Sequence, residues 1–124
     1  MAAYPAQAHR ARGDRRHLVA RVSDHPVDQP SGSAFHGTRL REELDRLGVA
    51  HLVICGVSTH SCVAQTAIDG FAQDLHVAVA CEAVASENPE LSDALLRFLA
   101  EEMRQPLLDQ ARSLALLRDG WPPR

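Results

Sequence analysis

The chain has 124 residues, 13 of them basic and 16 acidic, which gives a formal net charge of −3 at pH 7. This length predicts one domain with room for a hydrophobic core, and the weak negative charge with 4% aromatic residues makes nucleic-acid binding an unfavoured interpretation. No apolar run approaches the ~20 residues of a membrane-spanning helix, and no signal-peptide core is present, so we expect a cytoplasmic protein with no membrane partner.

The N-terminal region carries the first predicted features. Residues 1–16 hold four arginines against one aspartate and show no apolar period, so we interpret them as a mobile basic arm before a domain that spans residues 17–124. An arm of this kind could touch nucleic acid or an acidic partner, although a solvated tail is the favoured interpretation. A strand is expected at His17–Val22, followed by a proline-containing loop to residue 33.

The middle of the chain predicts a helix, a strand and a second helix. Thr38 is suited to cap a helix whose leucines recur at i, i+4 and i+7 and which ends at Gly48 in the left-handed conformation. An apolar run predicts a strand at about residues 51–56. A helical apolar spacing follows from about Cys62 to Gln73.

The rest of the chain repeats this alternation. A strand is expected at residues 76–81, and Asn88 with Pro89 predicts a capped helix whose apolar face runs to Met103. Residues 106–117 are expected to form a fourth helix. Alternating helices and near-continuous apolar strands predict an α/β fold, a doubly wound and mostly parallel sheet with helices on both faces.

Cys62 lies at the edge of this predicted sheet where ligands are expected. Ligands of parallel α/β sheets bind at the carboxyl ends of the strands, and the turn before Cys62 follows one such end. A cysteine near a helix N-terminus is also favoured as a thiolate, because unpaired N–H groups and the helix dipole stabilise negative charge. Cys62 is therefore a candidate nucleophile, with a small apolar residue packed under the sheet as the alternative.

The other residues with distinctive chemistry constrain the cellular setting. The three cysteines, Cys55, Cys62 and Cys81, are odd in number and lie in or beside apolar runs, which favours a reducing compartment over a disulfide framework. Cys55 and Cys81 are expected in the core. The spacing does not resemble a zinc site, and we expect no metal and no cofactor. All 13 basic residues are arginine, which suggests a GC-rich bacterial source.

Four short motifs occur in order along the chain. They are S-A-F-H-G-T at 33–38, G-V-S-T-H-S-C-V at 56–63, T-A-I-D at 66–69 and A-V-A-S at 83–86. With these motifs, about residues 27–103 resemble the isochorismatase-like cysteine hydrolases. The resemblance implies a Rossmann-like three-layer fold and hydrolysis of a small amide, a urea or, in the founding case, a vinyl ether.

The resemblance also implies roles for residues around Cys62. In the amidase members an aspartate, a lysine and a cysteine cooperate, and the thiolate forms a covalent acyl intermediate; Cys62 matches that nucleophile. A cis peptide bond is implied between Val57 and Ser58, with the N–H groups of Ser58 and Cys62 directed at the developing oxyanion. Preorganised donors of this kind lower a barrier by about 3–4 kcal/mol each.

Two departures from the family pattern bear on activity. Gln29, in Val27–Pro30, stands where the family has its lysine, and the chain contains no lysine. Only 26 residues precede Val27, and they hold no apolar strand ending in the family's aspartate, so the domain resembles an N-terminally truncated member. Asp24 and His60 are surrogate candidates for the missing base, and a solvated surface histidine is the alternative for His60.

Other side chains near the motifs have two interpretations each. Thr59 and Ser58 could bind a substrate, but capping the following helix is the expected role of their side chains. Phe35 could line the substrate pocket, or it could pack into the core. These alternatives stay open at the level of sequence.

Two functions from different classes therefore remain. The first is a cysteine hydrolase that acts on a small-molecule amide or carbamoyl substrate through Cys62, with activity impaired by the missing partners. The alternative is a non-catalytic truncated family member that serves as a structural or binding subunit. Because the resemblance places the lost strand in the middle of the sheet, an exposed strand edge and a homo-oligomer are also expected.

Overall fold

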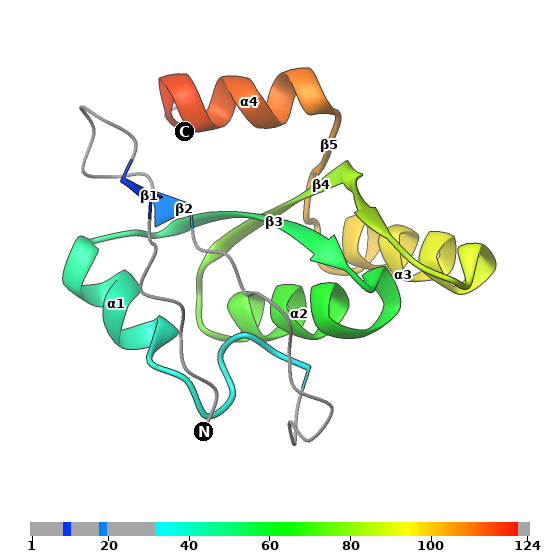
Figure 1. Ribbon diagram of the computed structural model, residues 1–124, viewed down its shortest axis with the longest axis horizontal. Coiled ribbons are helices and arrows are strands. Elements are labelled where there is room, and N and C mark those ends of the chain that lie inside the picture. The colour runs from blue at the N-terminus through cyan, green and yellow to red at the C-terminus, as the bar shows by residue number, and fades with distance from the viewer. Residues whose placement is uncertain (1–8, 11–17, 20–31, 122–124) are drawn as a thin grey trace.

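The computed structural model describes residues 9–10, 18–19 and 32–121 of the chain. Its elements, drawn in Figure 1, are β1 (His9–Arg10), β2 (Leu18–Val19), α1 (Leu40–Leu47), β3 (His51–Val57), the π-helical turn η1 (Thr59–Val63), α2 (Ala64–Ala72), β4 (His76–Ala85), α3 (Pro89–Glu101), β5 (Leu107–Leu108) and α4 (Gln110–Asp119). None of the described helices combines the length and the apolar character that crossing a bilayer requires.

The central sheet is parallel and has the strand order β3-β4-β5. Its first half is regular, with His51 opposite His76 and Ile54 opposite Val79, and an irregularity then brings Val57 opposite Ala85. The first half of β4 is buried and apolar, as expected for a strand covered on both faces. The carboxyl ends of β3 and β4 consequently meet at one edge of the sheet.

Helices cover both faces of this sheet. In Figure 1, α2 and α3 lie on one side and α4 on the other. Buried apolar side chains from α1, α2, β4 and α3 form one core cluster, whose most buried members include Leu44, Val79 and Leu99. The predicted α/β class, with a doubly wound parallel sheet, is confirmed in the described residues.

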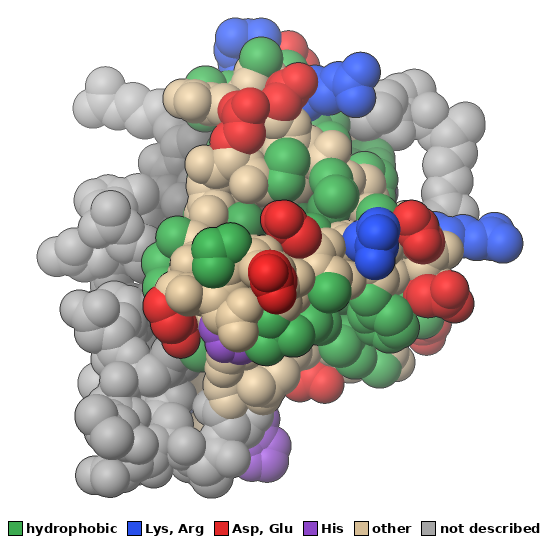
Figure 2. Space-filling view, turned by 90° about the vertical axis from the view of Figure 1, so that its right-hand side faces the viewer, with side chains coloured by type: hydrophobic (Ala, Val, Ile, Leu, Met, Phe, Trp, Pro, Cys, Tyr) green, Lys and Arg blue, Asp and Glu red, His purple; other side chains and the backbone are tan. Residues whose placement is uncertain are grey.

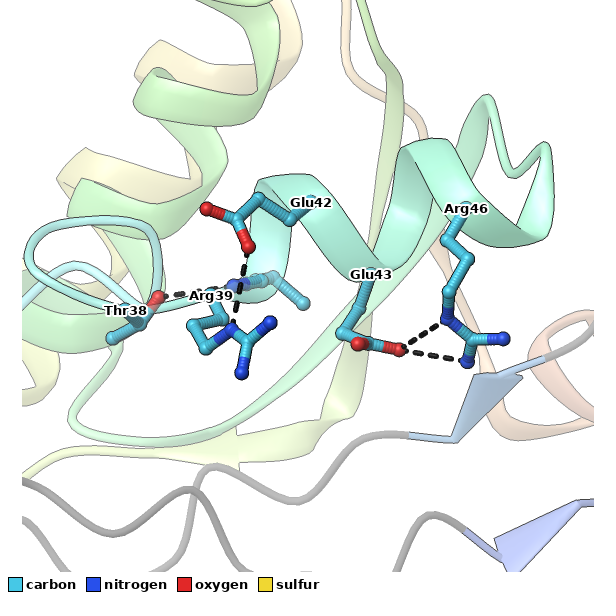
Figure 3. Close-up of polar contacts among 6 residues, drawn as sticks. Thr38, Arg39, Glu42, Glu43 and Arg46 are labelled. Atoms are coloured by element: carbon cyan, nitrogen blue, oxygen red, sulfur yellow. Dashed lines mark hydrogen bonds and ion pairs between the residues drawn. The ribbon is translucent and has the colours of Figure 1, made fainter.

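Helix α1 begins close to the predicted cap. The N-cap residue is Arg39, whose side chain makes no capping bond, but the Leu40 N–H donates to Thr38 Oγ1 at 3.3 Å. Gly48 ends the helix with φ 66°, the left-handed conformation that was predicted. Figure 3 shows the exposed ion pairs of its polar face, Arg39 with Glu42 and Glu43 with Arg46.

Several predicted element bounds are wrong. The helix expected from Cys62 begins earlier, at Thr59, and β4 continues four residues beyond the predicted end of its strand. The stretch expected as one helix over 106–117 is divided instead. Leu107 and Leu108 pair with β4, and α4 then starts after Asp109, whose side chain accepts from the Arg112 N–H at 2.8 Å.

Helix α3 starts as predicted. The Asn88 side chain accepts from the Leu91 N–H at 3.1 Å, and Pro89 occupies the first turn. The helix ends at Glu101, so Met103, expected on its apolar face, lies beyond its end and packs partly buried against the core.

The described part of the N-terminal region consists of two short strands. His9–Arg10, within the predicted mobile arm, forms β1 and pairs antiparallel with β2. Of the strand predicted at 17–22, only Leu18–Val19 lies in the described residues, and it belongs to this two-stranded sheet. The remainder of residues 1–31 lies outside the described part of the chain.

Candidate active site

The turn after β3 and the loop after β4 meet at the carboxyl edge of the sheet. Val57, the last residue of β3, lies opposite Ala85, the last residue of β4. Figure 2 looks onto the end of the molecule that lies at the right of Figure 1, where apolar side chains are interspersed with acidic ones. The cysteine singled out by sequence belongs to the first of these two segments.

Cys62 is a free, half-buried cysteine in η1, immediately before α2. The Val57–Ser58 peptide bond is cis, at the position that the resemblance implies. In the turn that follows, the N–H groups of Ser61 and Val63 both donate to the Ser58 carbonyl at 3.2 Å. Cys62 lies between these two donors in the sequence, and the oxyanion role of the Ser58 and Cys62 N–H groups stays a prediction.

The side chains of Ser58 and Thr59 do not have the expected capping role. Ser58 is the N-cap residue of η1, but its side chain makes no capping bond and instead donates to Glu87 Oε2 at 3.3 Å. Thr59 is fully buried, and its Oγ1 atom has no hydrogen-bond partner within the described residues. Ser58 therefore joins the turn to the loop after β4, and Thr59 leaves a buried polar atom in the same π-helical turn as Cys62.

His60 is not a solvated surface side chain. Only 19% of its side chain is exposed, Nδ1 lies 2.7 Å from Ser86 Oγ, and Nε2 lies 3.9 Å from Glu87 Oε1. The second distance falls within ion-pair range but exceeds a hydrogen bond. The loop after β4 thus hydrogen-bonds one ring nitrogen and places an exposed carboxylate near the other.

Glu87 is a site residue that sequence reasoning missed. The backbone N–H of Glu87 itself is the main cause that lowers the pKa of this carboxylate below its usual value. Desolvation opposes it, and the Ser58 hydroxyl and the nearby His60 lower the pKa further. The sequence offers one signal for Glu87, which is its place in a polar stretch directly after a predicted strand end. Nothing in that stretch indicated contact with residues 29 positions earlier.

Phe35 packs against the helix that follows η1. The loop that carries it is attached to α2, because the Gly32 N–H donates to Gln65 Oε1 at 3.2 Å and the Ala34 N–H to Thr66 Oγ1 at 2.9 Å. The Phe35 ring is partly buried beside the core cluster and lies against Gly70. A pocket-lining role for Phe35 and Thr59 stays a prediction.

The other two cysteines differ from the expected core positions. Cys55 is exposed, since it lies at the irregularity between Ile54 and Gly56 on β3. Cys81 is half-buried, and its thiol donates to the Leu108 carbonyl at 3.2 Å. Within the described residues, no three histidine, cysteine or acidic side chains gather in a way that could hold a metal ion.

Two of the sequence-predicted surrogates cannot be located. Asp24 and Gln29 both lie outside the described residues, as does the stretch that carries the glutamine in place of the family lysine. Of the surrogate candidates, the structure brings His60 into the same turn as Cys62.

Comparison with known proteins matches an isochorismatase domain model to residues 10–111. "Nicotinamidase 3" of Arabidopsis thaliana is 38% identical over 77 residues, which cover 62% of this chain and 39% of that protein. A "probable inactive nicotinamidase" of the same plant is 36% identical over 78 residues, covering 62% and 40%.

A solved structure gives a similar result. The pyrazinamidase/nicotinamidase of Streptococcus mutans superposes with a TM-score of 0.62 at 32% identity, covering 64% of this chain and 44% of the other. The chain therefore spans less than half the length of these relatives.

Proposed function

Because the chain belongs to the isochorismatase family, we propose that it is a cysteine hydrolase that cleaves a small amide or carbamoyl substrate at Cys62. The observation that carries the proposal is the position of this half-buried thiol in η1, at the carboxyl edge of the sheet. The likeness to nicotinamidases favours an aromatic carboxamide such as nicotinamide as the substrate class.

The reaction proceeds through an acyl-enzyme. The Cys62 thiolate attacks the amide carbonyl, a C–S bond forms, and the carbonyl electron pair moves onto oxygen, where the N–H groups of Ser58 and Cys62 stabilise it. The C–N bond then breaks, and the amine leaves with the proton that the thiol gave up. Water hydrolyses the thioester, which releases the carboxylic acid and restores the thiol.

His60 is the proton carrier that we assign to this cycle within the described residues. An imidazole can accept a proton near neutral pH and return it to the leaving amine. Asp24 is a second candidate for the base. Gln29 can hydrogen-bond a substrate, but it can neither take up a proton nor supply the charge of a lysine. Free thiols at Cys55, Cys62 and Cys81 suit work in the reducing cytoplasm.

A second candidate function is that of a non-catalytic subunit. Gln29 in place of the family lysine favours it, as does the similarity to a plant protein named as probably inactive. In this role the carboxyl edge of the sheet would serve as a binding surface, and no reaction would be catalysed there. Release of ammonia from an amide substrate separates the two candidate functions.

The test is release of ammonia from nicotinamide by the purified chain. We expect slow, multiple-turnover release that Cys62→Ala abolishes, because no other group in the proposed cycle can form the thioester. Cys55→Ala is the matched control: it removes an exposed thiol outside η1 and should leave the rate unchanged.

Two outcomes would contradict the hydrolase proposal. One is ammonia release from Cys62→Ala at the unsubstituted rate. The other is the absence of release from nicotinamide, pyrazinamide and a carbamoyl amino acid alike, which would favour the non-catalytic subunit.

A further inference from the structure

One edge of β3 has a composition that favours pairing with a further strand. The sequence of β3, H-L-V-I-C-G-V, contains no aspartate, glutamate, lysine, arginine or proline, the residues that commonly protect an exposed strand edge. Among the described elements β3 pairs only with β4, and α4 packs on β4 and β5 instead of β3. The strand that would pair with the second edge of β3 is therefore missing from this part of the chain.

A second copy of β3 is complementary to this edge when it runs antiparallel about Ile54. This register pairs the whole strand with itself and closes as a two-fold dimer, and β3 carries no formal charge that would repel its copy. Leu52 then lies opposite the partner's Gly56, which has no side chain to compete for the space, and Val53 lies opposite the partner's Cys55. A shift by one residue would bring side chains of opposite faces together, which disfavours the neighbouring registers.

The same register places His51 of one copy opposite Val57 of the other. Val57 ends β3 with 67% of its surface exposed, and Ser58 and η1 follow it directly. His51 is exposed, its ring stacks on His76 with centroids 4.6 Å apart, and the Trp121 ring lies against it at 4.8 Å. Because opposite residues of an antiparallel pair share a face, the partner brings this ring stack to the carboxyl edge of the sheet.

From this arrangement we infer that β3 pairs antiparallel with β3 of a second copy, and that the partner's His51 completes the rim of the candidate site beside Val57. The inference rests on the proposed function of Cys62, which makes this edge a substrate site. The partner's ring stack offers a flat apolar surface to an aromatic carboxamide, since aromatic rings stack on one another. Each dimer has two such sites, one at each end of the paired strands.

The first experiment measures the register by disulfide trapping. His51→Cys and Val57→Cys are made in separate chains, each also carrying Cys55→Ala, and the two chains are co-expressed and then oxidised. Opposite residues of an antiparallel pair have Cα atoms about 4.5–5.5 Å apart, a separation that a disulfide spans. We expect a covalent dimer from the co-expressed chains and none from either chain alone, because identical positions lie about 20 Å apart along the paired strands.

The second experiment tests whether residue 51 of the partner reaches the nucleophile. In a chain with His51→Cys and Cys55→Ala, β3 separates residue 51 from η1 of the same copy by about 20 Å, too far for a short bismaleimide. A cross-link from residue 51 to Cys62 therefore joins two copies. We expect a cross-linked dimer that Cys62→Ala removes and that Cys81→Ala, the matched control at another half-buried thiol, leaves unchanged.

Each result bears on the inference. If the co-expressed chains give no more covalent dimer than the separate chains, the register is overturned, whether the protein is then monomeric or associates through another surface. A cross-linked dimer that persists in Cys62→Ala, or the absence of any cross-linked dimer, would exclude the partner's His51 from the site. Because neither readout involves hydrolysis, both can succeed while nicotinamide is not cleaved, so failure of the proposed function is distinguishable from failure of this inference.

Discussion

Ser58 connects the two segments of the candidate site, the turn after β3 and the loop after β4, through its backbone carbonyl and its side-chain hydroxyl. Its carbonyl accepts from two N–H groups of η1, and its hydroxyl donates to Glu87 in the loop after β4. The backbone therefore organises the nucleophile's turn while the side chain holds the carboxylate that faces His60. A substitution that keeps the backbone should separate the two effects.

Ser58→Ala should raise the pKa of Glu87 toward its usual value of 4.5. The rise should be partial, since the larger cause of the lowered pKa, the backbone N–H of Glu87 itself, remains. A carboxyl whose pKa is lowered by folding stabilises the fold above its unfolded pKa, and this contribution is lost as pH falls through the folded pKa. In the variant this contribution is therefore smaller, and its loss is complete at a higher pH.

Carboxyl ¹³C chemical shifts followed through an acid titration give this measurement. Glu43 serves as the internal control, because its pKa is lowered mainly by a hydrogen bond from Arg46, far from Ser58 in the chain. A Glu87 titration that is the same with and without the Ser58 hydroxyl would refute the contact.

At the residue scale, the sequence was informative about Cys62 and silent about Glu87. An apolar strand followed by a short polar turn and a helix is a local pattern, so it located the cysteine. The contact of Glu87 with Ser58 depends on the strand register that brings the ends of β3 and β4 together. The sequence of a polar loop with a single glutamate does not indicate which strands pair or in which register.

At the element scale, close packing between α2 and β4 holds the site's helix on the sheet. Gly70 lies on α2 where a Cβ atom would be 2.9 Å from Val77 Cγ2, closer than real Cβ contacts allow. The small residue therefore lets the helix approach the strand.

Gly70→Ala should destabilise the chain by about 1 kcal/mol. Overpacking costs about 1–3 kcal/mol, and the better helix propensity of alanine offsets about 1 kcal/mol of it. Urea unfolding measures the change as a lower midpoint at constant slope. In a Val77→Ala background the same substitution should be neutral or stabilising, because the colliding methyl group is gone; an equal loss in both backgrounds would show that this contact is not the cause.

Local patterns predicted the apolar strands and the start of α3 at Asn88 and Pro89. They did not predict the start of η1, because Thr59, His60 and Ser61 are polar and the apolar helical period begins only at Val63. The helix expected at Leu107 and Leu108 was also wrong, because an apolar pair is compatible with a helical repeat as well as with a strand. Their pairing with β4 is a contact between distant parts of the chain.

At the scale of the molecule, β3 has the composition of a covered strand but pairs only with β4 within the described residues. Val57 at its end is 67% exposed. Strands of this kind invite pairing with another chain. The matched relatives are more than twice as long as the segment that they share with this chain.

We therefore expect the chain to self-associate as a homo-oligomer. Sedimentation velocity across a range of concentrations should show a species larger than the monomer, and arginine substitution of Val57 should shift the distribution toward monomer. A single monomeric species at high concentration would contradict the expectation.

The account depends above all on Cys62 forming a covalent acyl intermediate. The most direct measurement is peptide mass spectrometry of the chain after brief incubation with nicotinamide and an acid quench. We predict a nicotinoyl group on the peptide that contains Cys62 and none on the peptides of Cys55 or Cys81. An unmodified Cys62 in a sample that is releasing ammonia, or the acyl group on a different residue, would contradict it.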